Sequence, residues 1–173
     1  MFANRKTPCN YAHDMLSLKE GILLEDSQQI LRWGSSRSEA WQTGKPTHYN
    51  LKDDDTRIKW EEHMLDGLPC GLQAWLPDSA QLDHVTLWLR YPENTYPRDA
   101  FYQYCSFFDH FLRWIGVPKM QPREGSLYAP ILTWQHDGCH LKLYTGERFG
   151  DFTTLEIRKR PLFDALESAG EGT

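Results

Sequence analysis

The residue types best suited to chemistry lie close together in the stretch "QHDGCH", which contains His136, Cys139 and His140. Imidazole and thiolate are ligands that zinc prefers, and a zinc site needs three or four of them at compatible spacing. In a β-strand, however, successive side chains point to opposite faces, so Cys139 and His140 would diverge. The pattern therefore favours a strand, and neither a metal nor another cofactor is expected.

The carboxylates form no calcium-binding or acid–base pattern. The run "KDDDT" places Asp53, Asp54 and Asp55 side by side, but a calcium loop also needs a glycine at its turn and a closing glutamate. Glu61 and Glu62 are adjacent in a strand-like stretch, so alternation separates them and they cannot share a proton-transfer step. We interpret the three aspartates as a solvated acidic loop that steers an approaching partner.

Nucleophilic catalysis stays open as an alternative, because a cysteine and its histidine base are usually distant in the chain. His84, His140 and Cys105 are the residues that such an enzyme would use, in a cleft within the fold. The sequence contains no nucleophile-elbow pattern, no phosphate-cradling glycine loop and no H-E-x-x-H helix. The chain is therefore not predicted to be an enzyme.

Composition narrows the class of protein. A chain of 173 residues with 40% hydrophobic and 13% aromatic residues can build one compact core, and seven tryptophans indicate a core or an interface rich in large rings. The net charge of -5 argues against binding nucleic acid by phosphate neutralisation and favours a basic protein partner. No apolar run could span a bilayer, so no membrane partner is expected.

The cysteines and the N-terminus predict a cytoplasmic protein with free thiols. The N-terminal stretch has no apolar segment of signal-peptide type. No two cysteines form a C-x-x-C pair, which disfavours a redox motif. The cysteines are Cys9, Cys70, Cys105 and Cys139.

The elements that must position these residues are mostly strands. In the first half a short helix should contain Glu39 and Trp41, capped by Ser35 or Ser36 and stopped by the Gly-Lys-Pro that ends at Pro46. Residues 99–115 are predicted to be the strongest helix, with Phe101, Cys105, Phe108, Leu112 and Ile115 at helical spacing. Strand patterns occur in "TRIKWEE", "CGLQAWL", "HVTLWLR", "APILTWQ", "CHLKLYT" and "DFTTLEIRKR".

The order of these segments predicts an internal repeat. "DHVTLWLR" and "DFTTLEIR" align, and each follows a Gly-x-Pro breaker and two strand patterns in the same order. The predicted fold is α+β, with two tandem helix-plus-antiparallel-sheet repeats and the helices on one face of the sheet. The divisions are an irregular segment at 1–19, repeats at 20–95 and 96–160, and a short helix with a tail at 161–173. The alternative is a single irregular α+β domain with ordinary hairpins.

Strand alternation divides the predicted side chains between two faces. The apolar face should be covered by helices, and it contains Cys70, Leu72, Ala74, Leu76, Val85, Leu87, Leu89, Cys139, Leu141, Leu143, Thr153, Leu155 and Ile157. The other face is polar yet rich in aromatic rings, a mixture typical of protein-binding surfaces. It supplies the candidate partner-binding residues Trp75, His84, Trp88, Arg90, His140, Lys142, Tyr144, Phe152 and Glu156.

The stretch "ILRWGSSRSEAWQTGKP" resembles a pattern of small bacterial immunity proteins, in which an apolar strand ends in a Trp-Gly turn and a Ser precedes a short helix that closes at Gly-x-Pro. A duplicated helix-plus-sheet unit with an aromatic, polar face is also similar to the architecture of the β-lactamase inhibitor protein. The resemblance implies a cytoplasmic binding protein, monomeric or weakly dimeric, that neutralises a cognate protein toxin. The sheet face or the acidic loop would cover the active site of the toxin.

Two other functions stay open. One is the small enzyme described above, with its site between the repeats. The other is a self-associating structural protein, in which the aromatic face is buried between identical chains. Each ring, taken singly, could also pack under the loop that contains the aspartates or against the other repeat.

Overall fold

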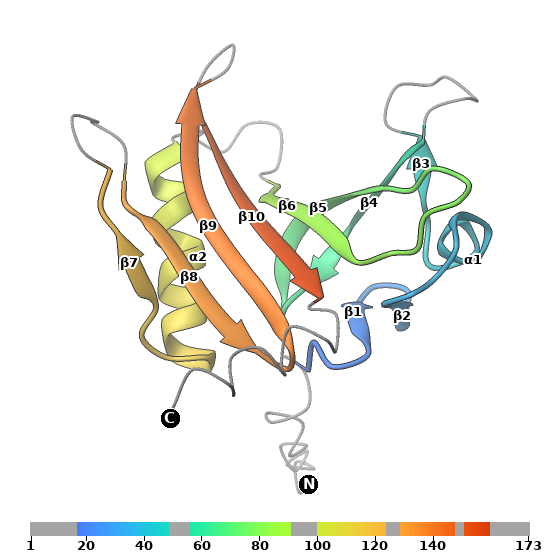
Figure 1. Ribbon diagram of the computed structural model, residues 1–173, viewed down its shortest axis with the longest axis horizontal. Coiled ribbons are helices and arrows are strands. Elements are labelled where there is room, and N and C mark those ends of the chain that lie inside the picture. Colours follow the sequence, from blue (N-terminus) through green and yellow to red (C-terminus); the bar gives the residue numbers. More distant parts are fainter. Residues whose placement is uncertain (1–16, 49–55, 91–99, 124–128, 148–150, 160–173) are drawn as a thin grey trace, which may run out of the picture.

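A computed structural model describes residues 17–48, 56–90, 100–123, 129–147 and 151–159, and its main feature is one twisted, antiparallel sheet of eight strands (Figure 1). The strand order is β3-β4-β5-β6-β10-β9-β8-β7, so the last strand of each half of the chain meets the other at the centre. The strands are β3 (Thr47–His48), β4 (Arg57–Met64), β5 (Leu68–Trp75), β6 (His84–Leu89), β7 (Lys119–Gln121), β8 (Ile131–His136), β9 (Cys139–Glu147) and β10 (Asp151–Lys159).

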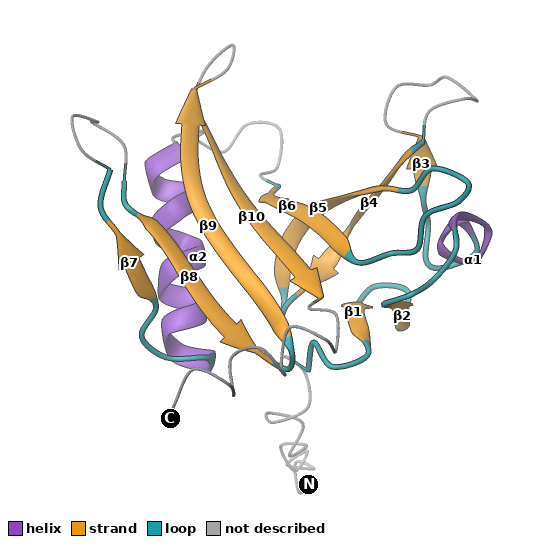
Figure 2. Ribbon diagram, viewed as in Figure 1, coloured by secondary structure: helices purple, strands orange, loops and turns teal. Residues whose placement is uncertain are grey.

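The remaining elements are a hairpin and two helices of very different length. The hairpin pairs β1 (Gly21–Leu24) with β2 (Gln29–Arg32), α1 is Arg37–Trp41, and α2 is Ala100–Trp114. Figure 2 shows α2 as the one long helix, running along the sheet beside β8 and β9, and α2 contacts β9 and β10. None of the helices in the described ranges is long and apolar enough to cross a membrane.

The predicted fold of two tandem helix-plus-sheet repeats is wrong. The described residues form a mostly β structure, in which only α2 is a substantial helix. In the first half, α1 has five residues and buries only Ala40, while Ile22, Leu24 and Leu31 of the hairpin are fully buried in the common core. The two halves are therefore covered by different kinds of element. The strand patterns occur in both halves of the chain, but a long covering helix occurs only in the second of the described halves.

Several of the predicted boundaries lie outside the described residues. This holds for the junction between the two predicted repeats, at residues 95 and 96, and for the predicted C-terminal helix and tail. The start of the irregular N-terminal segment lies outside them as well.

The inward face of the sheet follows the predicted alternation. Apolar side chains at every second position of β5, β6, β9 and β10 are buried in one core, together with side chains of the hairpin and of α2. All thirteen residues assigned to the inward face from the sequence are buried, and they include Thr153, whose hydroxyl donates a hydrogen bond to the Ala100 carbonyl of α2. Alternation alone was sufficient to divide these strands into a core face and an outer face.

The helix predicted at residues 99–115 is confirmed, but it buries a different stripe from the one that its apolar spacing suggested. Its buried residues are Ala100, Tyr104, Phe107 and Phe111, whereas Phe101 stays 60% exposed. Both stripes are apolar, so the sequence does not decide between them. Packing against the sheet fixes the rotation of α2 about its own axis. On the buried stripe, the Tyr104 hydroxyl donates a hydrogen bond to the carbonyl of Pro130, just before β8, at 2.7 Å.

The local prediction for the first short helix is also confirmed. Ser36 is the N-cap and forms a capping box with Glu39, because each side chain accepts from the backbone N–H of the other residue. The helix ends at Trp41, and Gly44 follows with φ of 67°, a conformation that favours glycine.

Beyond the pairing of β6 with β10, contacts of the covering elements join the halves of the molecule. The Nε2 of His110 in α2 lies 2.5 Å from the Leu65 carbonyl, in the turn between β4 and β5. The Leu18 N–H, just before β1, donates to Asp137 at 2.9 Å, in the turn between β8 and β9. Each covering element is therefore anchored to the opposite half of the sheet.

Candidate protein-binding face

The face of the sheet opposite α2 and the hairpin carries the candidate residues. We call it the open face and define it as the outward-pointing residues of β4, β5, β6, β10, β9, β8 and β7, together with Arg90 at the end of β6. The β1–β2 turn reaches it at the end of β4, where Asp26 lies 2.9 Å from the Nδ1 atom of His63, while α2 packs on the other side of the sheet. All nine candidates that lie within the described residues are on this face and are half-buried or exposed, namely Trp75, His84, Trp88, Arg90, His140, Lys142, Tyr144, Phe152 and Glu156.

The acidic loop cannot be placed against this face. Asp53, Asp54 and Asp55 lie outside the described residues. Their assignment to partner binding stays a prediction.

Cross-strand pairing brings residues distant in the sequence into rows on the open face. In one row Arg158 of β10 lies between His84 of β6 and His140 of β9. In the next row Glu156 lies between Thr86 and Lys142. Directly paired side chains in a sheet have Cβ atoms about 5 Å apart, so each row is a contiguous surface.

An aromatic cluster marks the half of the open face formed by β4, β5 and β6. The Trp88 ring lies on Gly71 of the neighbouring strand, where a Cβ atom would come within 2.2 Å of the ring. The Lys59 ammonium lies over the same ring, 5.7 Å from its centroid, and pairs with Glu61. Arg90 reaches Glu61 as well, at 3.3 Å. The indole is therefore fixed between the sheet and a charged network.

A similar cluster marks the half formed by β9 and β10. The Phe152 ring lies on Gly146, where a Cβ would approach the ring to 2.5 Å, and Tyr144 meets Phe152 edge to face at 6.4 Å. The Lys142 ammonium lies 5.0 Å from the Tyr144 centroid. The Tyr144 hydroxyl donates to Glu156 at 2.7 Å; burial and this carboxylate raise the pKa of Tyr144 to about 12.

Trp75 differs from the other rings. It ends β5 opposite Arg57 and is 66% exposed, the highest exposure of any described aromatic residue. A large apolar ring in this position leaves most of its surface in contact with water, which is unfavourable for an isolated chain. Trp75 is therefore the ring on this face that has most area to bury against a partner.

His84 is a half-buried base at the centre of the sheet. Its Nε2 atom is buried and has no hydrogen-bond partner among the described residues. Burial lowers its pKa below the usual 6.5, and adjacent Arg158 lowers it further, against the opposing influence of Glu156 and Asp83. The lowered pKa favours the neutral form of the imidazole at pH 7.

The stretch "QHDGCH" is a hairpin turn. Asp137 and Gly138 both have positive φ, 52° and 71°, and connect β8 to β9, as expected for a two-residue turn of this composition. Cys139 is fully buried with a pKa raised by burial, while His140 is on the open face, so the predicted divergence of these two side chains is confirmed. Within the described ranges, no three His, Cys, Asp or Glu side chains gather as metal ligands would.

The predicted separation of Glu61 and Glu62 is confirmed too. Glu61 is on the open face, whereas Glu62 is 3% exposed and accepts hydrogen bonds from the backbone and the hydroxyl of Ser27 at 2.9 and 2.8 Å. The buried carboxylate holds the β1–β2 turn against β4. It has a structural role.

The residues of the enzyme alternative do not come together. Cys105 is on α2, on the covered side of the sheet, whereas His84 and His140 are on the open face. The sheet separates the thiol from both imidazoles. A Cys–His pair cannot form from these residues in this fold.

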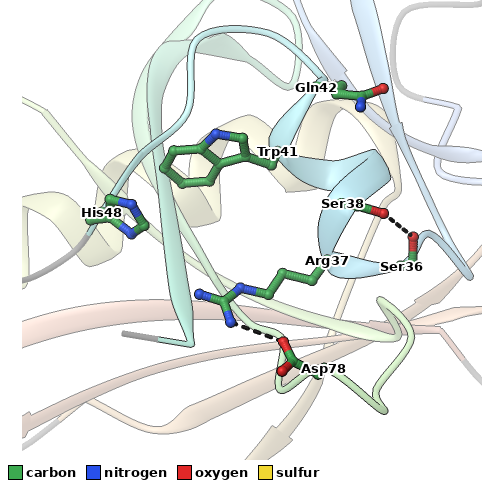
Figure 3. A pocket seen from close by; sticks show the side chains of 7 residues that line it. All are labelled: Ser36, Arg37, Ser38, Trp41, Gln42, His48 and Asp78. Atoms are coloured by element: carbon green, nitrogen blue, oxygen red, sulfur yellow. Dashed lines mark hydrogen bonds and ion pairs between the residues drawn. The ribbon is translucent and has the colours of Figure 1, made fainter. Parts of the chain in front are cut away.

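A pocket of about 580 Å³ lies beside α1, at the β3 edge of the sheet (Figure 3). In it, Arg37 forms an ion pair with Asp78 at 3.0 Å, and Trp41 contacts the His48 ring with 4.4 Å between centroids. His48 is paired with the buried Ile58, which places its side chain on the covered side of the sheet. The pocket is therefore separate from the open face. It is lined by Ser36, Arg37, Ser38, Trp41, Gln42, His48 and Asp78.

Sequence reasoning missed several residues that shape the open face. Lys59 and Glu61 were not assigned to this face, because their roles depend on which strand lies beside which. Alternation places Arg158 on this face, but Arg158 was not among the candidate partner-binding residues. Gly71 and Gly146 were missed as well, although a glycine inside a strand pattern is a known signal for close approach of another group. That signal could have located both aromatic clusters.

No protein-family model, no curated protein and no solved structure matches this chain.

Proposed function

We propose that this protein binds another protein through its open face and acts as an immunity protein that neutralises a cognate toxin. The observation that carries the proposal is a broad sheet face, on the side of the sheet opposite α2, on which rings are held in place next to one largely exposed tryptophan, Trp75. Tryptophan, tyrosine and arginine are the residues that most often dominate binding energy in protein interfaces.

The open face is preorganised for binding. Trp88 and Phe152 are seated on glycines of neighbouring strands, and Tyr144 is held by Glu156. Groups that are already fixed lose little conformational entropy when a partner arrives. With neighbouring strands about 5 Å apart, the seven strands span about 30 Å, a scale compatible with the roughly 800 Å² that each partner buries in a standard interface.

The toxin-neutralising form of the proposal is supported by the local arrangement of residues 30–46. The strand β2 is followed by Trp33 and Gly34, the Ser36 cap, a one-turn helix and Gly44, a layout that resembles the pattern of small immunity proteins. In this form, the open face blocks the active site of the toxin by covering it.

Co-expression with the product of the neighbouring gene tests the proposal. We expect that product to arrest growth when expressed alone, to lose its toxicity in the presence of this protein, and to co-purify with it. Replacing a tryptophan that is a binding hot spot costs at least about 2 kcal/mol, so Trp75→Ala should weaken the complex about 30-fold and reduce protection. Thermal stability should change little, because the Trp75 ring is mostly exposed.

Trp114→Ala is the matched control. Trp114 is also exposed, at 36%, but belongs to α2 on the other side of the sheet, so this variant should protect as well as the wild type. A harmless neighbouring product would overturn the immunity function, and equal binding by Trp75→Ala and wild type would overturn the use of the open face.

A further inference from the structure

The open face is basic, although the chain as a whole carries a net charge of -5. Among the described residues, its only acidic side chains are Glu61 and Glu156, and both are engaged within the face, by Lys59 and Tyr144 respectively. Its basic side chains are Arg57, Lys59, Arg90, Lys119, Lys142 and Arg158. The chain as a whole is therefore negative, whereas the surface that would meet a partner is positive.

The centre of this face holds a basic row without a carboxylate. Arg158 is exposed and has His84 and His140 as its direct cross-strand neighbours. An opposite charge on a directly paired residue stabilises a sheet, and the two residues paired directly with Arg158 are both histidines. An incoming carboxylate would supply that opposite charge.

The lysines nearby are held in position by rings. The Lys142 ammonium lies over Tyr144, and that of Lys59 lies over Trp88. A cation held over an aromatic face keeps a defined direction while its remaining N–H donors stay available. The Lys142 ammonium is therefore ready to pair with an acidic surface, whereas that of Lys59 already pairs with Glu61.

The same contacts make a single-stranded nucleic acid a poor fit. Proteins that bind single strands stack bases on exposed aromatic faces. Here one face of Trp88 and of Phe152 lies against a glycine, and the ammonium groups lie over Trp88 and Tyr144. Trp75, at the end of β5, is the one described ring of this face that is largely exposed, so the face offers several cations and a single stacking platform, which suits carboxylates more than a run of bases.

We propose that the open face docks an acidic protein surface, whose carboxylates pair with Arg158, Lys142 and their basic neighbours. The inference rests on the proposed function in assuming that the open face is the binding face, and it names the chemistry of the partner. Complementary charge of this kind raises association rate and specificity, and both effects weaken as salt screens the charges.

An NMR titration of the full chain with polyglutamate tests this inference without the toxin. At low salt, polyglutamate should shift the resonances of His140, Lys142 and Arg158 most strongly, while polylysine should leave them unchanged. Salt should weaken the interaction several-fold. Arg158→Glu and Lys142→Glu should weaken it as well, whereas Arg113→Glu, a reversal on α2 behind the sheet, should not.

The possible outcomes separate the two proposals. Polyglutamate binding that persists in Arg158→Glu and Lys142→Glu, or polylysine binding to the open face, overturns the acidic partner. Tighter binding of oligothymidylate than of polyglutamate at the same residues overturns it in favour of a nucleic acid. If polyglutamate binds as expected but the neighbouring gene product is neither toxic nor bound, the immunity function fails and the acidic docking chemistry stands.

Discussion

The two halves of the sheet are arranged alike but covered differently. From each edge, strands follow one another in chain order toward the centre, where β6 pairs with β10. Over β4 lies the β1–β2 hairpin, while over β9 and β10 lies α2. Each cover buries large apolar side chains, such as Leu31 in the hairpin and Phe107 in the helix. The alternation of side chains in a strand therefore specifies which face of the sheet is covered, but it does not specify whether a hairpin or a helix covers it.

The open faces of the two halves are more alike than their covers. Each half seats an aromatic ring on a glycine of the adjacent strand, Trp88 on Gly71 and Phe152 on Gly146. Each half also holds a lysine over a ring. The similarity is therefore greater on the surface proposed for binding than in the core.

The largest effects should come from truncating a buried side chain in either covering element. Phe107→Ala should cost about 3 to 5 kcal/mol, and Leu31→Ala about 2 to 5 kcal/mol, because each leaves a cavity in the core. Urea denaturation followed by fluorescence and by circular dichroism measures both. We expect one transition in each variant, since His110 and Leu18 link each cover to the opposite half.

Phe101→Ala is the control, because Phe101 is on the exposed side of α2 and should change stability by less than about 0.5 kcal/mol. Separate transitions in Leu31→Ala would mean that the halves are independent units. That outcome would contradict a single core shared by the two halves.

Intermediate effects are expected at the glycines beneath the rings. Gly71→Ala would bring its Cβ within 2.2 Å of Trp88 and Gly146→Ala within 2.5 Å of Phe152, so each should cost about 1 to 3 kcal/mol through overpacking. Thermal and urea unfolding give the loss. In the double variant Gly71→Ala/Trp88→Ala, the loss should be smaller than the sum of the single losses; additive losses would show that the ring does not lie on Gly71.

The smallest effect should be the pH dependence contributed by one histidine in each half, His84 and His110. Burial is the main cause that lowers both pKa values below 6.5. Their contribution to stability is therefore complete above about pH 6.5 and is lost as the pH falls toward the lowered values, because the unfolded chain then binds more protons. Unfolding free energies measured between pH 7.5 and 5 should decline less in His84→Gln and in His110→Gln than in the wild type; an unchanged decline in both would contradict this assignment.

Much of the local structure could be predicted because its causes are local. The alternation of Val85 and Leu87 with Thr86 and Trp88 placed these side chains on their correct faces, and Ser36 with Glu39 gave the helix cap. The exposed Trp75 and the half-buried Trp88 share the predicted face, but the sequence did not show that one is free and the other is seated on a glycine. Burial of each ring depends on its neighbours across the sheet.

The errors in the predicted repeats and in the predicted buried stripe of α2 have one physical cause. A short stretch of sequence does not specify which distant element will pack against it. The second helix helped to suggest two equal repeats, yet the first half is covered by a hairpin. Within α2, the stripe containing Phe101 and the stripe containing Phe107 are both apolar, and contact with the sheet selected the latter.

The sequence by itself determined the six longer strands, the division of their side chains between two faces, and the cap of the first helix, since these follow from alternation and from bonds between near neighbours. Only the tertiary structure decided the strand order, the covering elements and the basic character of the open face. Arg158 lies between two histidines, and Lys59 lies over Trp88, because strands far apart in the sequence hydrogen-bond side by side. Net charge is a sum over the chain, whereas a partner meets the charges that folding brings to one surface.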